Sequence, residues 1–243
     1  MNIFLKTEDE IELMREANLL VGKTLAEVGR HVKPGVSTLQ LDKIAEEFIC
    51  DNGAIPTFKG FPSSYGTPFP GSICASVNDV VVHGVPSEDV VLKDGDIISI
   101  DCGALLNGFN GDSCYTFCVG EVSEDIMNLL RATKESLYKG IEVAEAGHHV
   151  GDIGHVIQDY CQAQGYGIVR ELTGHGIGRE MHEDPSIPNY GKRGTGVLLK
   201  VGMCIAIEPM VTMGNREIGL LPDRWGIVTR DHVQQHTLNI LLP

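Results

Sequence analysis

One order of segment types occurs twice along this chain, and such a repeat limits the folds that the chain can adopt. In the first part, capping residues and apolar spacing predict amphipathic helices over 7–31 and 37–50. A His83-Gly84 step follows, and then an apolar strand that we expect to end at Asp101. The second part repeats this order. Its two predicted helices cover 123–144 and 151–164, its His-Gly step is His175-Gly176, and its strand ends at the acid Glu208.

The repeat predicts an α+β fold of two pseudo-symmetric halves, in which helices cover a curved antiparallel sheet. We expect residues 1–243 to form a single catalytic domain with halves of about 7–120 and 121–237. Two related halves that face each other would place a site at their interface.

The composition and net charge of the chain exclude several classes of function. At 243 residues and 42% hydrophobic content the chain can bury a substantial core, and a net charge of −14 argues against nucleic acid or an anionic membrane as the main partner. No apolar stretch approaches the roughly 20 residues of a membrane span, and the N-terminus does not have the pattern of a signal peptide. Seven cysteines without a CxxC pair are typical of reduced thiols, so we expect a cytoplasmic protein.

Four potential metal ligands stand at or near the ends of apolar runs: Asp101, Asp112, His175 and Glu208. Each alone is more often a turn former, a salt-bridged acid or a structural histidine, but the four together favour a metal site. The segment 107–111 has the turn signals of a hairpin that would bring the two aspartates together, and paired carboxylates need a cation. Three acids and one imidazole suit Mn, Fe, Co or Zn, and one or two such ions would support amide hydrolysis by a metal-activated water.

Two further histidines, His83 and His182, come from separate segments in which glycine or proline favours a strand end. Both could bind the carbonyl or nitrogen of a substrate beside the metal.

The chain resembles type I methionine aminopeptidase, a member of the creatinase-like pita-bread metallopeptidases, from about Thr7 to Thr237. Five segments carry the resemblance: 77–86, 94–101, 107–112, 173–178 and 206–210. The resemblance implies the pita-bread fold and the metal-dependent removal of N-terminal methionine from nascent polypeptides.

The resemblance also implies roles for individual residues. Asp101, Asp112, His175 and Glu208 match metal ligands, Glu208 also matches the residue that transfers the proton of the water, and His83 and His182 match the histidines at the scissile amide. Residues at the positions that line the methionine pocket are Phe58, Phe61, Cys74, Met181 and Trp225, for which core packing is a competing interpretation.

The chain departs from the family pattern at one position. The family has a fifth ligand, a glutamate before His-Thr, where this chain has Gln235. Glutamine carries no charge and cannot bridge two cations as a carboxylate does, so we expect weaker metal binding and reduced activity. The preceding segment is about four residues shorter than the family pattern, and Asp231 is a candidate replacement carboxylate.

Two other functions remain open from the sequence. The chain could be a non-catalytic pita-bread module that binds peptides, which the loss of one ligand favours and the retention of four ligands opposes. It could also be a prolidase or aminopeptidase P-like Xaa-Pro peptidase, although those relatives carry an extra N-terminal domain for which a helix at Thr7 leaves no room. As partners we expect N-terminal peptide substrates, including nascent chains at the ribosome, and we expect a monomer.

Overall fold

The structure is a computed structural model that describes residues 2–63, 66–233, 235–237 and 239–242, with only the backbone described after residue 233. The helices are α1 (Glu8–Gly29), α2 (Thr38–Asp51), α3 (Glu124–Glu142) and α4 (Val150–Ala163). The strands of the first part are β1 (Ile55–Pro56), β2 (Ile73–Val77), β3 (Val80–Val82), β4 (Ile97–Leu106) and β5 (Phe109–Cys118). The later strands are β6 (Gly167–Ile168), β7 (Gly174–Gly176), β8 (Glu183–Ile187), β9 (Ile205–Ile207), β10 (Met210–Thr212), β11 (Ile218–Leu220), β12 (Ile227–Thr229), β13 (Gln235–Thr237) and β14 (Asn239–Leu242).

The predicted helices are confirmed, because local capping fixes where they begin. Thr7 and Ser37 close capping boxes with Glu10 and Gln40, so the first free N–H groups of α1 and α2 are satisfied by side chains. Ser123 caps α3 in the same way, through a hydrogen bond from the Ile126 N–H.

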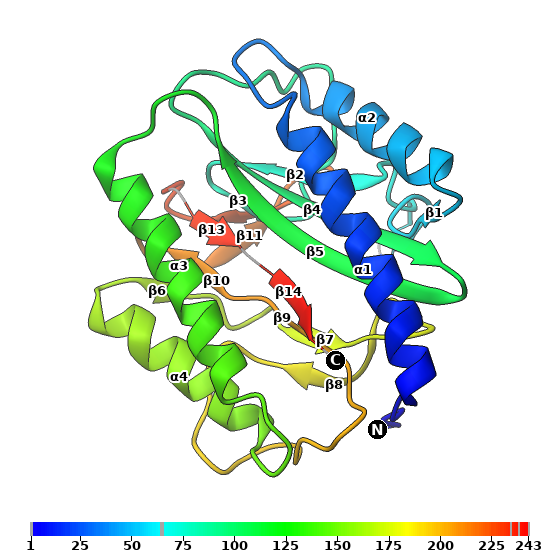
Figure 1. The fold of residues 1–243 in the computed structure, drawn as a ribbon. Helices are drawn as coiled ribbons and strands as arrows, with labels where there is room; N and C mark the ends of the chain where they lie inside the picture. The colour runs from blue at the N-terminus through cyan, green and yellow to red at the C-terminus, as the bar shows by residue number, and fades with distance from the viewer. Residues whose placement is uncertain (1, 64–65, 234, 238, 243) are drawn as a thin grey trace.

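The largest of the three described sheets is antiparallel and runs through both parts of the chain in the order β1-β4-β5-β14-β9-β7-β8, with β2 paired to β4. Asn107 and Gly108 both have positive φ, 54° and 82°, as a two-residue hairpin between β4 and β5 requires. This architecture confirms the predicted α+β fold with a helix-covered antiparallel sheet (Figure 1).

One strand prediction was wrong. Asp101 does not end its strand, because β4 continues for five more residues to Leu106, paired with β5 throughout. Buried Cys102 and Ala104 extend the apolar pattern beyond the acid, and Gly103 between them leaves room for the Phe58 ring, which would lie 2.9 Å from an added Cβ. The acid therefore lies on the face of the sheet.

Two apolar cores lie beneath the helices. One packs α1 and α2 against β2 and β4, and the other packs α3 and α4 against β9 and β10 (Figure 1). Among the described residues, no helix is long and apolar enough to cross a membrane.

Candidate active site

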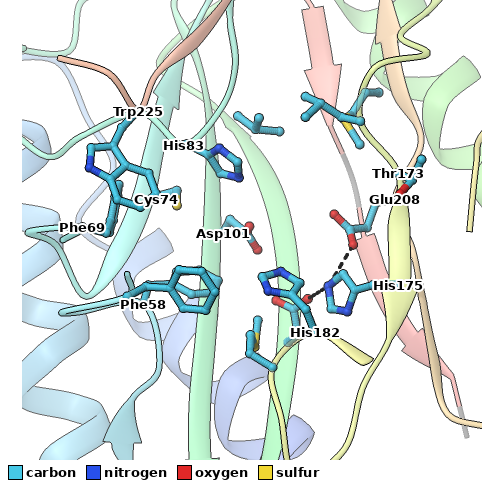
Figure 2. Close-up of a pocket in the computed structure, with 16 residues that line it drawn as sticks. Phe58, Phe69, Cys74, His83, Asp101, Thr173, His175, His182, Glu208 and Trp225 are labelled. Atoms are coloured by element: carbon cyan, nitrogen blue, oxygen red, sulfur yellow. Dashed lines mark ion pairs between the residues drawn. The ribbon is translucent and has the colours of Figure 1, made fainter. Parts of the chain in front are cut away.

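A cavity of about 290 Å³ lies on the sheet between the two helix pairs, and both parts of the chain line it (Figure 2). Its polar lining consists of His83, Asp101, Asp112, Thr173, His175, His182 and Glu208. Its apolar lining consists of Phe58, Phe61, Phe69, Cys74, Val82, Leu172, Met181, Met210 and Trp225. The structure thus gathers at one cavity all six predicted metal and catalytic residues and all five predicted pocket residues.

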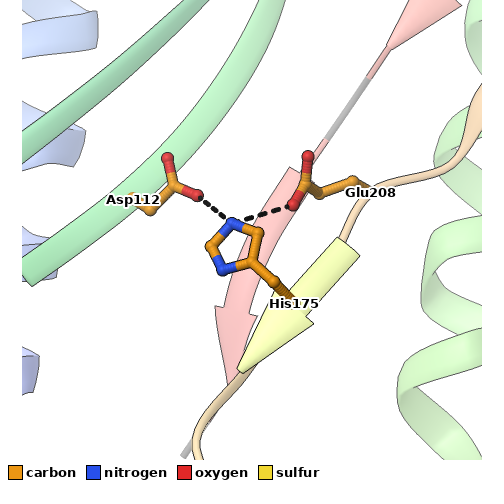
Figure 3. A group of neighbouring side chains, drawn as sticks. All are labelled: Asp112, His175 and Glu208. Carbon is orange, nitrogen blue, oxygen red and sulfur yellow. Dashed lines mark ion pairs between the residues drawn. The ribbon is translucent and has the colours of Figure 1, made fainter. Parts of the chain in front are cut away.

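Three of the predicted ligands form a tight group. Ligand atoms of Asp112, His175 and Glu208 lie within 4.8 Å of one another (Figure 3). His175 Nε2 is 3.5 Å from Asp112 Oδ2 and 3.2 Å from Glu208 Oε1, and the three side chains are only 2–13% exposed. Carboxylates withdrawn from water in this way need a cation, and a proton on His175 or a metal ion could each serve.

The tautomer and the charge of His175 follow from its neighbours. Its Nδ1 donates to the Gly176 carbonyl at 2.8 Å, so Nε2 faces the carboxylates. Burial alone would lower the pKa of His175, but the Asp112 carboxylate and the charge of Glu208 outweigh burial and raise that pKa to about 9.

Asp112 is held from behind by helix α1. Its N–H donates to the Asn18 side-chain oxygen at 3.0 Å, and at Gly111 an added Cβ would lie 2.6 Å from the Ala17 carbonyl carbon. The helix backbone therefore rests directly on β5 beside the acid. Asp112 Oδ1 is buried and has no hydrogen-bond partner among the described residues. A buried carboxylate oxygen without a partner is costly, and this one suits a metal ligand.

Asp101 lies on the same sheet face as Asp112. The pairing of Asp101 with Cys114 and of Gly103 with Asp112 makes the two acids diagonal neighbours across β4 and β5. Asp101 lines the cavity (Figure 2) but is not in the group of three within 4.8 Å. The predicted hairpin does bring both carboxylates to one site.

The two His-Gly steps have the same steric cause. An added Cβ at Gly84 would lie 2.3 Å from the Ala75 carbonyl oxygen, and one at Gly176 would lie 2.3 Å from the Asp184 carbonyl oxygen. A neighbouring strand therefore passes too close for any residue but glycine. His83 itself has φ of 58°, a conformation that is uncommon outside glycine and is typical of residues held at functional sites.

His182 faces the metal-ligand group from the turn that directly precedes β8. Its ring centroid lies 4.4 Å from that of His175 and 5.3 Å from that of Phe61, both edge-on. Desolvation in the cavity, and then the charge of His175, lower the pKa of His182, and burial lowers the pKa of His83. Both side chains are therefore neutral at pH 7 and can donate or accept one hydrogen bond each.

The apolar side of the cavity is aromatic. The rings of Phe69 and Trp225 meet edge-to-face at 5.1 Å, and the Trp225 indole N–H donates to the Thr67 carbonyl at 3.1 Å. Burial, and then the charges of Asp101 and Asp112, raise the pKa of Cys74 well above its ordinary value, so this thiol belongs to the apolar wall rather than to the chemistry.

Sequence reasoning missed part of the lining. Phe69, Val82, Leu172, Thr173 and Met210 also line the cavity. Val82, Thr173 and Met210 lie inside the segments 77–86, 173–178 and 206–210 that carry the resemblance, and Leu172 directly precedes the second of these, so the signal was adjacency to His83, to Gly174 and to Glu208-Pro209.

Two residues near the carboxyl terminus, Gln235 and Asp231, were considered for the place of the family's fifth metal ligand. The side chain of Gln235 lies outside the described residues, although the backbone of β13 is described and places Gln235 opposite Thr212 of β10. Asp231 is exposed, accepts hydrogen bonds from the N–H groups of Asn215 and Val233, and does not line the cavity. Its carboxylate stabilises a loop, so it does not replace the family's glutamate.

A helix-covered antiparallel sheet that carries a cavity lined by acids and imidazoles is typical of a metal-dependent hydrolase. The chain matches metallopeptidase family M24 over residues 12–234 and belongs to this family. The ligand set agrees with that assignment, because buried oxygen and imidazole donors converge and one carboxylate oxygen has no partner among the residues described.

Comparisons with individual proteins agree with the assignment to the metallopeptidase family. The chain is 50% identical to the methionine aminopeptidase of Clostridium acetobutylicum over 229 residues, which cover 94% of this chain and 90% of that one. It is also 50% identical to methionine aminopeptidase 1 of Bacillus subtilis over 242 residues, which cover 98% of this chain and 95% of that protein. The crystal structure of methionine aminopeptidase from Rickettsia prowazekii superimposes with a TM-score of 0.94 at 41% identity, and the match covers 99% of this chain and 95% of that chain.

A more distant structure shares the fold alone. The prolidase from Pyrococcus horikoshii superimposes with a TM-score of 0.76 at 22% identity, and the match covers 98% of this chain but 59% of the prolidase.

Proposed function

We propose that this protein removes N-terminal methionine from polypeptides in a metal-dependent hydrolysis. The observation that carries the proposal is the two-sided cavity, in which an acid and imidazole group faces an aromatic wall (Figure 2). A flexible, apolar methionine side chain suits that wall, and the scissile bond would then lie over the polar side. The relatives named methionine aminopeptidase support the proposal.

Asp101, Asp112, His175 and Glu208 are the proposed metal ligands, for one or two divalent ions such as Co, Mn, Fe or Zn. When bound, such ions supply an activated water and polarise the scissile carbonyl. The fit is supported by Asp112 Oδ1, which has no hydrogen-bond partner in the part of the chain that the structure describes, and by the Nε2 of His175, which faces Asp112.

The remaining steps belong to the protein's own side chains. We assign to Glu208 the transfer of the water's proton to the departing amine, since its carboxylate borders both the ligand group and the cavity. His182 and His83, neutral at pH 7, donate hydrogen bonds to the scissile amide without adding charge to the site. Phe58, Phe61, Cys74, Met181 and Trp225 hold the methionine side chain and exclude water.

Gln235 is the proposed cause of weakened metal binding, because it provides an uncharged amide where the family has a bridging glutamate. A second ion would be affected most, since bridging two cations requires both carboxylate oxygens.

The proposed setting is the cytoplasm, where the substrates would be the N-termini of new polypeptides, including chains still on the ribosome. The charge of −14 supports recognition of the peptide rather than of ribosomal RNA. We propose that the chain acts as a monomer with one catalytic domain.

The test is hydrolysis of Met-Ala-Ser and of Ala-Pro by purified protein reconstituted with excess Mn, Co, Fe or Zn, with bound metal measured in parallel. Turnover of Met-Ala-Ser alone supports the proposal, and turnover of Ala-Pro alone would replace it with an Xaa-Pro peptidase. No turnover at full metal loading would favour the peptide-binding module. Asp112→Asn is the control, and we expect it to lose both metal and turnover.

A further inference from the structure

A buried ion pair joins two distant segments beside the cavity. Lys6 Nζ lies 2.5 Å from Glu183 Oε2, and both side chains are only 5% exposed. Lys6 Nζ also donates to the Phe4 carbonyl at 3.1 Å. Withdrawing two charges from water costs several kcal/mol per ion, and a buried pair is often no more stable than an apolar replacement. Stability alone is therefore a weak explanation for this pair.

The Glu183 end holds the turn that carries His182. The second carboxylate oxygen, Oε1, accepts from the Glu180 N–H at 3.3 Å, and the Gly178 N–H donates to the Glu180 carbonyl at 3.1 Å. These bonds close the turn of residues 180–183, in which Met181 and His182 both line the cavity.

The Lys6 end is fixed to another part of the molecule. Its N–H donates to the Gly202 carbonyl at 2.7 Å, and the next residue, Thr7, caps α1. Helix α1 in turn rests on β5 beside Asp112. The ion pair thus connects the turn of His182 to the helix that supports a proposed metal ligand.

The space around the pair is closely fitted. At Gly178 an added Cβ would lie 2.5 Å from Lys6 Cε and 2.6 Å from Glu183 Oε1. Both side chains of the pair therefore pack directly against the backbone at Gly178, where only glycine leaves room for them.

We propose that Lys6 and Glu183 are positioning residues, which set His182 at its distance from His175 and thereby at the scissile amide. The inference rests on the proposed function, and neither residue lines the cavity. The pair acts through the 180–183 turn, so it should affect the reaction of bound substrate more than the binding of metal.

The first test is Lys6→Met/Glu183→Leu in the metal-loaded protein with Met-Ala-Ser. This variant removes both charges and leaves no unpaired ion, so it should fold. A displacement of about 1 Å at a catalytic group can lower the rate about a hundredfold. We expect kcat to fall at least about tenfold on that scale, with KM and metal affinity within about twofold of the wild type. A wild-type kcat would overturn the proposal.

A double-mutant cycle shows whether the pair acts through His182. We expect Lys6→Met/Glu183→Leu to cost nothing further in a His182→Ala background, because the group that it positions is gone. An equal loss of kcat in both backgrounds would overturn the positioning role. The matched control is Arg131→Met, which breaks the exposed 3.1 Å pair with Glu124 and should leave kcat unchanged.

Hydrogen exchange of the metal-free protein gives a readout that is independent of turnover. In Lys6→Met/Glu183→Leu, the Glu180 amide loses its acceptor and should exchange at least about tenfold faster, while amides of α3 keep their rates. Unchanged exchange at Glu180 would overturn the inference. If the wild-type protein hydrolyses no methionyl peptide, the proposed function fails while the exchange result still tests the pair.

Discussion

The charge state of His175 gives a prediction with a calculable size. Without metal, its pKa of about 9 keeps the imidazole protonated at pH 7, where its positive charge lies between the side chains of Asp112 and Glu208 and offsets part of the charge of the group. A metal ion needs the lone pair of Nε2 and must displace that proton. Two pH units below the pKa, about one imidazole in a hundred is neutral. The apparent metal affinity at pH 7 should therefore be about a hundredfold weaker than above pH 9, or about 2.7 kcal/mol.

The same shift has a consequence for stability. The folded-state pKa of His175 lies above the ordinary value of 6.5, so the protonated form stabilises the metal-free protein below pH 6.5 and this stabilisation is lost as pH rises through about 9. A shift of that size corresponds to about 3 kcal/mol. Bound metal should remove the dependence, because it replaces the proton.

Histidine NMR titration of the metal-free protein is the direct assay. We expect His175 to titrate near 9 and His182 below 6.5, and we expect Asp112→Asn to lower the pKa of His175 by removing its acceptor and a nearby charge. Calorimetry in two buffers should then show about one proton released per ion bound at pH 6.5, where water on a metal keeps most of its proton. A wild-type His175 pKa at or below 6.5 would refute the reasoning.

Three further predictions follow from single sites. Gln235→Glu should raise metal affinity about tenfold or more by adding a carboxylate, measured by isothermal titration, and no gain would mean that position 235 is not the missing ligand. Gly111→Ala should lower the free energy of unfolding by about 3 kcal/mol and Tm by about 6–12 °C, because the added Cβ would overlap the backbone of Ala17. The control is Gly22→Ala in α1, where an added Cβ would meet nothing within 4 Å, and this change should raise the free energy of unfolding by up to about 1 kcal/mol. Excess Mn at a hundred times its Kd should raise the stability of the metal-free protein by about 2.7 kcal/mol in a thermal melt, and an unchanged Tm would argue against a metal site in the folded protein.

Local rules predicted most of the fold. The helix starts followed from capping residues such as Thr7 and Ser37, which act within one turn of chain. The β4–β5 hairpin followed from Asn107-Gly108 for the same reason. The error at Asp101 arose because a charged residue in an apolar run normally marks a strand end, whereas here the acid points into a cavity on the face of the sheet. That orientation depends on the distant residues that form the cavity.

The site was harder to predict wherever partners are distant in sequence. Chemistry and spacing were sufficient to select Asp112, His175 and Glu208, which the structure brings within 4.8 Å. The Lys6–Glu183 pair spans 177 residues and has no local pattern, so it emerged only from the fold. The close approach of α1 to Gly111 could not be predicted either, because the two segments are distant in sequence.

The paired His-Gly steps show why a repeat does not determine chemistry. His83 and His175 stand at corresponding places, each before a glycine that a neighbouring strand packs against. Yet burial lowers the pKa of His83, while the carboxylates around His175 raise its pKa to about 9. The His83 ring lies edge-on to Trp225, at 6.4 Å between ring centroids, and burial is the cause of its lowered pKa. The same backbone device thus produces a neutral hydrogen-bonding group in one half and a metal-binding group in the other, because the surrounding charges decide which proton state each imidazole holds.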